Sequence, residues 1–165
     1  MSSRFVSERP EHGAAIELVL DRAFGPGRFA KTSERVRERG ALAEPALSRV
    51  ALDANQNVIG VCRIWRVSAG GAPLHFLGPL AVDPGAQEAG LALALAKDAA
   101  AAVRAAGGGG LVTVGAEAFF RPLGFTQVPL GRLTLPVPSN PARLLWLQLT
   151  PGGLDNAHGE IGAPS

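Results

Sequence analysis

The sequence predicts an α/β protein in which helices cover both faces of a central sheet. Two helical segments at the start of the chain are followed by strands that alternate with further helices, an order typical of this class. The expected strand over residues 58–67 is apolar on both faces, as in a sheet that is covered on both sides. Of the 165 residues, 47% are hydrophobic and 18% are charged, which excludes a disordered chain.

The first two elements are expected to be helices. Ile16, Val19 and Leu20 recur at helical spacing over residues 10–24, and a Gly-Pro-Gly turn follows them. A second, more polar helix is expected over residues 32–39, because a Thr-Ser pair can cap its start and a glycine follows its end.

A β-hairpin and a third strand are expected next. Residues 47–52 and 58–67 are rich in Val, Ile and Leu, and a polar turn lies between them. Cys62 lies in the second of these strands, where we expect a small buried hydrophobic side chain and not a nucleophile. Residues 74–82 form a third apolar segment, which we also expect to be a strand.

The remaining elements are expected to alternate between helix and strand. In order, they are a long helix over residues 91–106, a strand over 111–114, a short helical segment over 116–123, a strand over 125–128 or as far as 135, a Pro-rich loop over 136–141 and a last strand over 143–149. Four glycines at 107–110 end the long helix, and the tail from about residue 151 is expected to be irregular.

Composition excludes several classes of function. The net charge is +2, with a pI near 9.3, and basic residues alternate with acidic ones, so no nucleic-acid surface is expected. Cys62 is the single cysteine, which excludes an internal disulfide, and the three histidines lie at no metal-ligand spacing. The sequence has no apolar signal segment and no membrane-spanning stretch, so we expect a soluble, cytoplasmic protein that binds no membrane.

One candidate anion site lies at residues 87–92, where small residues join the third strand to the long helix. A helix N-terminus presents unpaired backbone N–H groups and the positive end of a dipole, so it can hold a phosphate group. Any strand–helix connection also needs small residues. This spacing alone therefore leaves both a phosphate site and an ordinary turn open.

Four stretches, taken in order, carry a resemblance to a known family. They are DRAFG at residues 21–25, LGPLAVDP at 77–84 followed by Gln87-x-x-Gly90-x-Ala92, VGAEAFFRPLGF at 114–125, and LLWLQLTPG at 144–152. They resemble the GCN5-related N-acetyltransferase (GNAT) superfamily, and within it the YhbS-like bacterial branch. The resemblance implies a mixed, mostly antiparallel sheet of about six to seven strands, splayed between its fourth and fifth strands, in one domain over residues 1–165.

The resemblance also implies an acetyl-CoA-dependent N-acyltransferase, in which an acceptor amine attacks the thioester directly. The backbone of Leu80, Ala81 and Val82 is implied to pair with the pantetheine arm, and one backbone N–H of this strand to hold the oxyanion. The pyrophosphate is implied to lie on backbone N–H groups of the following residues: Gln87, Glu88, Ala89, Gly90, Leu91 and Ala92.

Two departures from the family pattern concern the cofactor loop and the proton donor. Glu88 places a carboxylate beside the implied pyrophosphate, and Ala89 replaces a basic residue. A repulsion of about 1 kcal/mol corresponds to roughly tenfold weaker binding, and Arg121 could offset it if its side chain reaches the cofactor. Phe120 stands where many relatives carry the tyrosine that protonates the leaving thiolate, and the chain has no tyrosine.

The general base and the acceptor are less defined. His75 is a weak candidate for the base, because the strand register turns it to the opposite face, and Glu117 is the second candidate. Arg28 and Lys31 suit an acidic amine, whether a small molecule or a peptide, and the apolar last strand suggests a homodimer. An active N-acyltransferase is favoured over a lapsed relative that binds acyl-CoA as a sensor or partner domain. A domain that binds no CoA is the third alternative.

Overall fold

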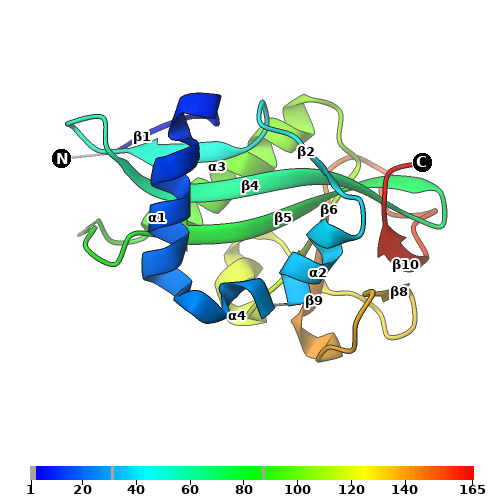
Figure 1. The fold of residues 1–165 in the computed structure, drawn as a ribbon. Helices are drawn as coiled ribbons and strands as arrows, with labels where there is room; N and C mark the ends of the chain where they lie inside the picture. Colours follow the sequence, from blue (N-terminus) through cyan, green and yellow to red (C-terminus); the bar gives the residue numbers. More distant parts are fainter. Residues whose placement is uncertain (1–2, 31, 87) are drawn as a thin grey trace.

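The computed structural model describes residues 3–30, 32–86 and 88–165, which are arranged around one sheet (Figure 1). Along the main path of this sheet, the described strands lie in the spatial order β1 (Arg4–Ser7), β3 (Arg49–Leu52), β4 (Val58–Ala69), β5 (Ala72–Val82), β6 (Gly110–Val114), β9 (Leu144–Gln148) and β7 (Thr126–Gln127). Three short strands lie off this path: β2 (Leu42–Ala43), β8 (Leu133–Thr134) and β10 (Gly159–Gly162). Only β5 and β6 are parallel along the described path, so the mixed, mostly antiparallel sheet is confirmed.

Helices cover both faces of the sheet, as the element order predicts. The α-helices are α1 (Gly13–Phe24), α2 (Thr32–Glu38), α3 (Leu91–Ala105) and α4 (Glu117–Phe120), and the short 3-10 segments are η1 (Pro10–His12), η2 (Pro26–Ala30), η3 (Arg121–Leu123) and η4 (Pro141–Arg143). α1 crosses one face of β4 and β5, and α3 lies on the opposite face (Figure 1). Within the described part of the chain, no helix combines the length and apolar character needed to cross a bilayer.

The apolar face of α3 forms the larger part of the core. Leu91, Leu95 and Val103 of this helix are buried in one cluster with Cys62 and Leu77 of the sheet. Burial raises the pKa of the Cys62 thiol far above its usual range, because an apolar environment disfavours the thiolate. The expectation that Cys62 is a small buried hydrophobic side chain is confirmed.

The opposite face of the sheet is covered in two parts. α1 packs Ile16, Val19 and Leu20 against β3, β4 and β5, as the helical spacing of these side chains predicts. Further along the same strands, Val36 of α2 shares a cluster with the C-terminal segment. The end of α1 and the start of α2 are thereby placed over the middle of β5 (Figure 1).

The structure contains three strands that the sequence pattern does not predict, the two-residue β2 and the longer β1 and β10. β1 pairs antiparallel with β3, and β10 pairs Ile161 with Ala69 of β4. The expected irregular tail is therefore wrong at Gly159–Gly162, because Ile161 is fully buried and draws this segment onto the sheet. The Arg132 guanidinium also donates hydrogen bonds to three backbone carbonyls of the segment that precedes β10.

The apolar last strand of the sequence pattern is β9, which lies inside the sheet. β9 pairs with β6 over its whole length and with β7 at Leu145 and Trp146. Part of its outer edge is thus already occupied within the chain. The homodimer stays a prediction.

Leu95→Ala in α3 is expected to lower the free energy of unfolding by about 2–5 kcal/mol, because Leu95 is fully buried and its truncation leaves a cavity. The matched control is Leu18→Ala in α1, where the side chain is 51% exposed and the expected change is within about 0.5 kcal/mol. Urea denaturation of both variants measures the difference. Equal effects of the two substitutions would contradict the packing of α3 described above.

Candidate functional site

β5 and β6, the strands implied to splay, separate partway along β5. They pair in parallel from His75–Leu111 to Leu77–Thr113. At the last of these pairs, Oγ1 of Thr113 donates a hydrogen bond to the backbone oxygen of Leu77 at 2.9 Å. Beyond this point β5 continues to Val82 beside β4 alone. The splay leaves one edge of β5 open.

β5 also bulges where it leaves β6. Gly78 and Pro79 lie opposite a single residue of β4, so β5 contains one extra residue here. The indole Nε1 of Trp65 donates a hydrogen bond to the backbone oxygen of Gly78 at 2.7 Å. Gly78 has a φ of 143°, a conformation that residues with a side chain rarely adopt. The bulge thus shifts the backbone of the residues that follow it.

After the bulge, two backbone positions of β5 face the open gap. The N–H of Asp83 donates to the backbone oxygen of Ile59 in β4 at 2.8 Å. Because successive residues of a strand direct their backbone groups to alternate sides, Ala81 also faces β4. The N–H and C=O groups of Leu80 and Val82 therefore face the gap. Of the three residues implied to pair with a pantetheine arm, these two present free backbone groups.

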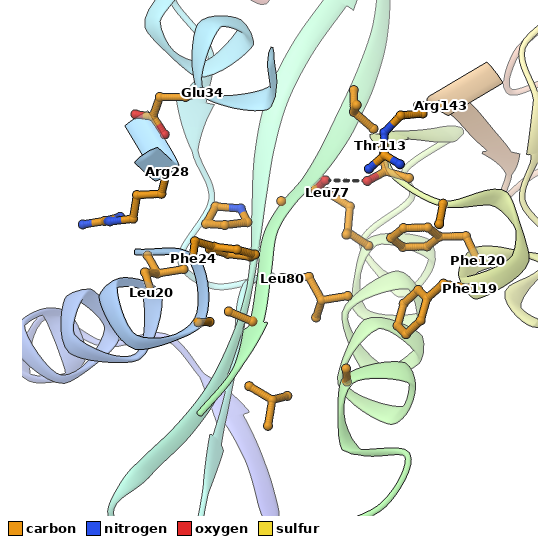
Figure 2. Close-up of a pocket in the computed structure, with 18 of the residues that line it drawn as sticks. Leu20, Phe24, Arg28, Glu34, Leu77, Leu80, Thr113, Phe119, Phe120 and Arg143 are labelled. Carbon is orange, nitrogen blue, oxygen red and sulfur yellow. Dashed lines mark hydrogen bonds between the residues drawn. The ribbon is translucent and has the colours of Figure 1, made fainter. Parts of the chain in front are cut away.

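A cleft of about 370 Å³ occupies the gap. Figure 2 shows α1 and the segment after it on one side of β5, and Thr113, Phe119 and Phe120 on the other. Most of the wall is apolar and consists of Leu20, Ala23, Phe24, Leu77, Pro79, Leu80, Ala81, Val82, Ala92, Val114, Ala116, Phe119 and Phe120. The cleft reaches from the β5 bulge to the first turn of α3.

The N-terminus of α3 closes one end of this cleft. Gly90 is the N-cap with a φ of 74°, and its carbonyl accepts from the N–H of Ala94 at 3.0 Å. The N–H groups of the first turn, including those of Leu91 and Ala92, have no partner inside the helix by the geometry of a helix start. Ala92 lines the cleft directly. Gln87 lies outside the described residues.

Glu88 is held away from the cleft by the start of the chain. Its two carboxylate oxygens accept hydrogen bonds from the backbone N–H of Ser3 at 3.0 Å and from the Ser3 hydroxyl at 2.8 Å. Glu88 and Ala89 line a separate hollow between α1 and the β3–β4 turn. The sequence pattern did not indicate this contact, which joins residues 85 positions apart.

Phe120 forms one wall of the cleft and is almost fully buried. Its ring makes edge-to-face contacts with Phe119 at 4.9 Å and with Phe125 at 5.2 Å between ring centroids. A side chain at Gly115 would meet this ring at 2.5 Å, so the glycine allows the ring to lie against β6. The ring offers no proton donor to the cleft.

The two base candidates and Arg121 lie outside this cleft. His75 lies at the paired end of β5, where its ring is close to Gly108 beyond α3. Glu117 forms an ion pair with Arg121 at 2.8 Å across one turn at the surface. Neither the implied base candidates nor Arg121 lines the cleft. Among the described residues, no group of three or more His, Cys, Asp and Glu side chains could hold a metal ion.

Two cationic residues of the cleft were not singled out by the sequence pattern. Arg37 of α2 is 9% exposed and forms an ion pair with Glu34, and its Cζ lies 5.8 Å from the centroid of Trp65. Burial lowers the pKa of the Arg37 guanidinium, against the opposite effect of Glu34, and an arginine remains charged at neutral pH. Arg143, which is exposed, lines the opposite wall near Thr113 (Figure 2).

Of the two cations expected for an acidic amine, Arg28 also lines the cleft. Its guanidinium is shared between Glu17 at 2.8 Å and Asp21 at 3.0 Å, so its charge is balanced by α1. Lys31 lies outside the described residues. Arg28 lies in η2 beside α1, whereas Arg37 reaches the cleft through the placement of α2, which no local signal in the sequence could have revealed.

His75 gives a testable pH dependence of stability. Desolvation lowers the pKa of His75 below its ordinary value, about 6.5 in an unfolded chain. The unfolded chain therefore binds the proton more tightly, so this histidine lowers stability as the pH falls below about 6.5, until the depressed folded-state pKa is passed. His75→Gln is expected to reduce the loss of unfolding free energy between pH 7.5 and 5. An unchanged pH dependence in urea titrations would contradict the burial of His75.

Several solved structures are similar to this chain. A structure of the GNAT-family N-acetyltransferase YhbS from Escherichia coli in complex with CoA has a TM-score of 0.82 and 26% identity, covering 99% of this chain and 90% of that one. A GNAT-family acetyltransferase from Brucella melitensis in complex with acetyl-CoA has a TM-score of 0.71 and 26% identity, over 99% and 96% of the chains. A GNAT-family acetyltransferase from Staphylococcus aureus, at 14% identity, shares the fold with a TM-score of 0.58 over 90% and 100%.

The amino-acid sequence also matches a family of known proteins. A search of curated proteins gives no match. The family described as "Acetyltransferase (GNAT) family" matches residues 14–125, which include α1, the splayed strands, the start of α3 and Phe120. The chain therefore belongs to the GNAT acetyltransferase family.

Proposed function

We propose that this protein is an acetyl-CoA-dependent N-acyltransferase that moves an acetyl group to an amine. The observation that carries the proposal is the open backbone edge of β5 at Leu80 and Val82, inside an apolar cleft that ends at the N-terminus of α3. The family and the two neighbours at 26% identity, one in complex with CoA and one with acetyl-CoA, support it.

The residues of the cleft fit the parts of this co-substrate. The pantetheine arm contains amide groups, and the N–H and C=O groups of Leu80 and Val82 can pair with them as a strand would. The pyrophosphate is negatively charged, and the first turn of α3, including Leu91 and Ala92, offers backbone N–H groups and a positive dipole end. Ala81 holds the strand to β4 from the other side.

The chain's main role in the transfer is to position the two substrates and to polarise the carbonyl group of the thioester. Acetyl-CoA supplies an activated thioester, and in the net reaction a nitrogen–carbon bond forms, the carbon–sulfur bond breaks, and the amine proton passes through solvent to the leaving sulfur. The N–H of Leu80 faces the gap just after the bulge, where it can stabilise negative charge on the acetyl oxygen. Phe120 excludes water and donates no proton, so solvent must protonate the CoA thiolate.

A lapsed, acyl-CoA-binding sensor or partner domain is the second candidate. The observation that favours it is Phe120, which places a hydrocarbon ring in the cleft wall of a chain that has no tyrosine. General acid assistance typically contributes about 10²–10⁴-fold to rate. Because the CoA thiolate is a good leaving group, slow transfer without such assistance is compatible with an enzyme, and we place the transferase first.

Binding and turnover together test the proposal. Calorimetric titration with acetyl-CoA is expected to show one site, and CoA release is expected with at least one member of a panel of amines. Ligand binding to the folded state should also raise the melting temperature, with the shift increasing with ligand concentration. Binding without CoA release for every amine would favour the sensor, and the absence of binding would overturn both candidates.

Glu88→Gln tests the cofactor loop. Removing the carboxylate near the start of α3 is expected to lower the Kd for acetyl-CoA by up to about tenfold, because it removes repulsion of the diphosphate. The gain should shrink at high salt, since exposed charges are screened. Glu160→Gln, an exposed acid on β10, is the control. Ser3 holds this carboxylate away from the cleft, so the test measures whether repulsion persists at that distance, and an affinity that is unchanged or weaker in Glu88→Gln would contradict the repulsion.

A further inference from the structure

Arg37 has a donor that the described protein does not use. Its Nη2 pairs with Glu34, whereas its Nη1 is buried and finds no hydrogen-bond partner among the described residues. This Nη1 lies 3.9 Å from the point where a side chain at Gly78 would begin, and both residues line the cleft. A buried guanidinium nitrogen without a partner is costly, so it calls for an acceptor atom from outside the chain.

The neighbouring backbone carbonyls do not accept a hydrogen bond from this donor and are engaged with other side chains. The carbonyl of Gly78 accepts from Trp65, and the carbonyl of Leu77 accepts from Thr113. The Trp65 ring attracts the guanidinium through its face and offers no lone pair to the N–H group. The donor of Arg37 is therefore left for a ligand in the cleft.

One cation that lines the cleft has no acidic partner among the described residues. Glu34 forms an ion pair with Arg37, and Glu17 and Asp21 both form ion pairs with Arg28. Arg143 reaches the same end of the cleft from the opposite wall and forms no ion pair with a described residue (Figure 2). Two acids share the single charge of Arg28, so these three arginines and three acids balance in sum, and Arg143 is the cation without a direct acidic partner among the described residues.

We propose that the acceptor amine also carries a carboxylate, and that Nη1 of Arg37 binds this carboxylate; the inference rests on the proposed acetyl transfer. With its amine neutral, as attack on a thioester requires, such a molecule has one net negative charge, which complements Arg143. Arginine suits the role because its planar guanidinium keeps its charge and donates hydrogen bonds in fixed directions.

The short separation between the Arg37 donor and the backbone N–H of Leu80 suits a short amino acid. The Arg37 donor faces Gly78, and the N–H implied to hold the acetyl oxygen belongs to Leu80, two residues further along β5. Only Pro79 separates these two residues along the bulge of β5, so one small molecule can present its carboxylate to Arg37 and its amine to the acetyl group. Leu20, Ala23 and Phe24 border this space, which suits an apolar side chain.

The test is a panel of matched amines assayed for CoA release. Leucine, valine, β-alanine and γ-aminobutyrate are each compared with the amine that lacks only the carboxyl group, at equal concentrations of neutral amine. The parent protein is expected to show kcat/KM at least tenfold higher for the preferred amino acid than for its matched amine. Leucinamide, which keeps the shape of leucine without the charge, is expected to resemble the carboxyl-free amine.

Arg37→Gln is expected to abolish this preference, mainly through a higher KM for the amino acid. The double variant Glu34→Gln/Arg37→Gln removes both charges of the ion pair and so keeps the cleft balanced if the single variant fails to fold; thermal unfolding checks both. Arg35→Gln, on the exposed side of α2, is the control and should retain the preference. A preference that survives in the folded Arg37 variants, or that is absent from the parent, overturns the inference.

A binding measurement separates this inference from the transferase proposal. Calorimetry with 4-methylpentanoate, the carboxylate of leucine without its amine, is carried out on the CoA-saturated protein, or on the protein alone if CoA does not bind. Binding to the parent that is at least tenfold weaker in the double variant supports the carboxylate site even if no amine is acetylated. Failure of 4-methylpentanoate and of every amino acid to bind overturns the site, whereas acetylation without carboxylate preference overturns it and leaves the transferase intact.

Discussion

The open edge of β5 is the constraint on which the rest of the molecule depends. Backbone N–H and C=O groups need partners when water is excluded, yet β5 is paired on its β6 side only as far as Leu77. From the bulge to Val82, this side of the strand borders an apolar cleft. A strand-like ligand satisfies these groups, so the defect of the sheet is the basis of the proposed co-substrate site. The arrangement persists only if the two halves of the sheet are prevented from closing.

Packing on both sides of the sheet keeps the gap open. α3 fills the space under β5 with Leu91 and Leu95, and the Phe120 ring occupies the place where β6 would otherwise approach. On the other face, α1 covers Ala81 and Val61. The pairing of β5 with β6 ends at the bulge, where two side chains donate hydrogen bonds to the carbonyls of Leu77 and Gly78. Without these bonds, the two carbonyls would be left unpaired. The bend in β5 is therefore part of a packed structure and not a loose end of the sheet.

Sequence patterns predicted the long elements and missed contacts made across the chain. The α3 helix and the β3–β4 hairpin follow from local periodicity and turn residues, which the chain carries within short windows. β1 and β10 are four residues each, too short for periodicity to reveal, and they exist because β3 and β4 offer them edges. The backbone edge and Phe120 were expected only through the family resemblance. Arg37 and Arg143 could not be found, because they line one cleft from positions more than a hundred residues apart in the chain.

The proposed use of main-chain groups at Leu80 and Val82 has a consequence for how this fold can diversify. Backbone N–H and C=O groups are present whatever side chain a residue carries. Substitutions can therefore accumulate along β5 without removing the half of the site that would bind the co-substrate. The proposed acceptor half, by contrast, is built from individual side chains on α1, α2 and η4. The two halves can therefore evolve, or be engineered, independently: a new acceptor requires exchange of a few side chains over an unaltered cofactor cradle.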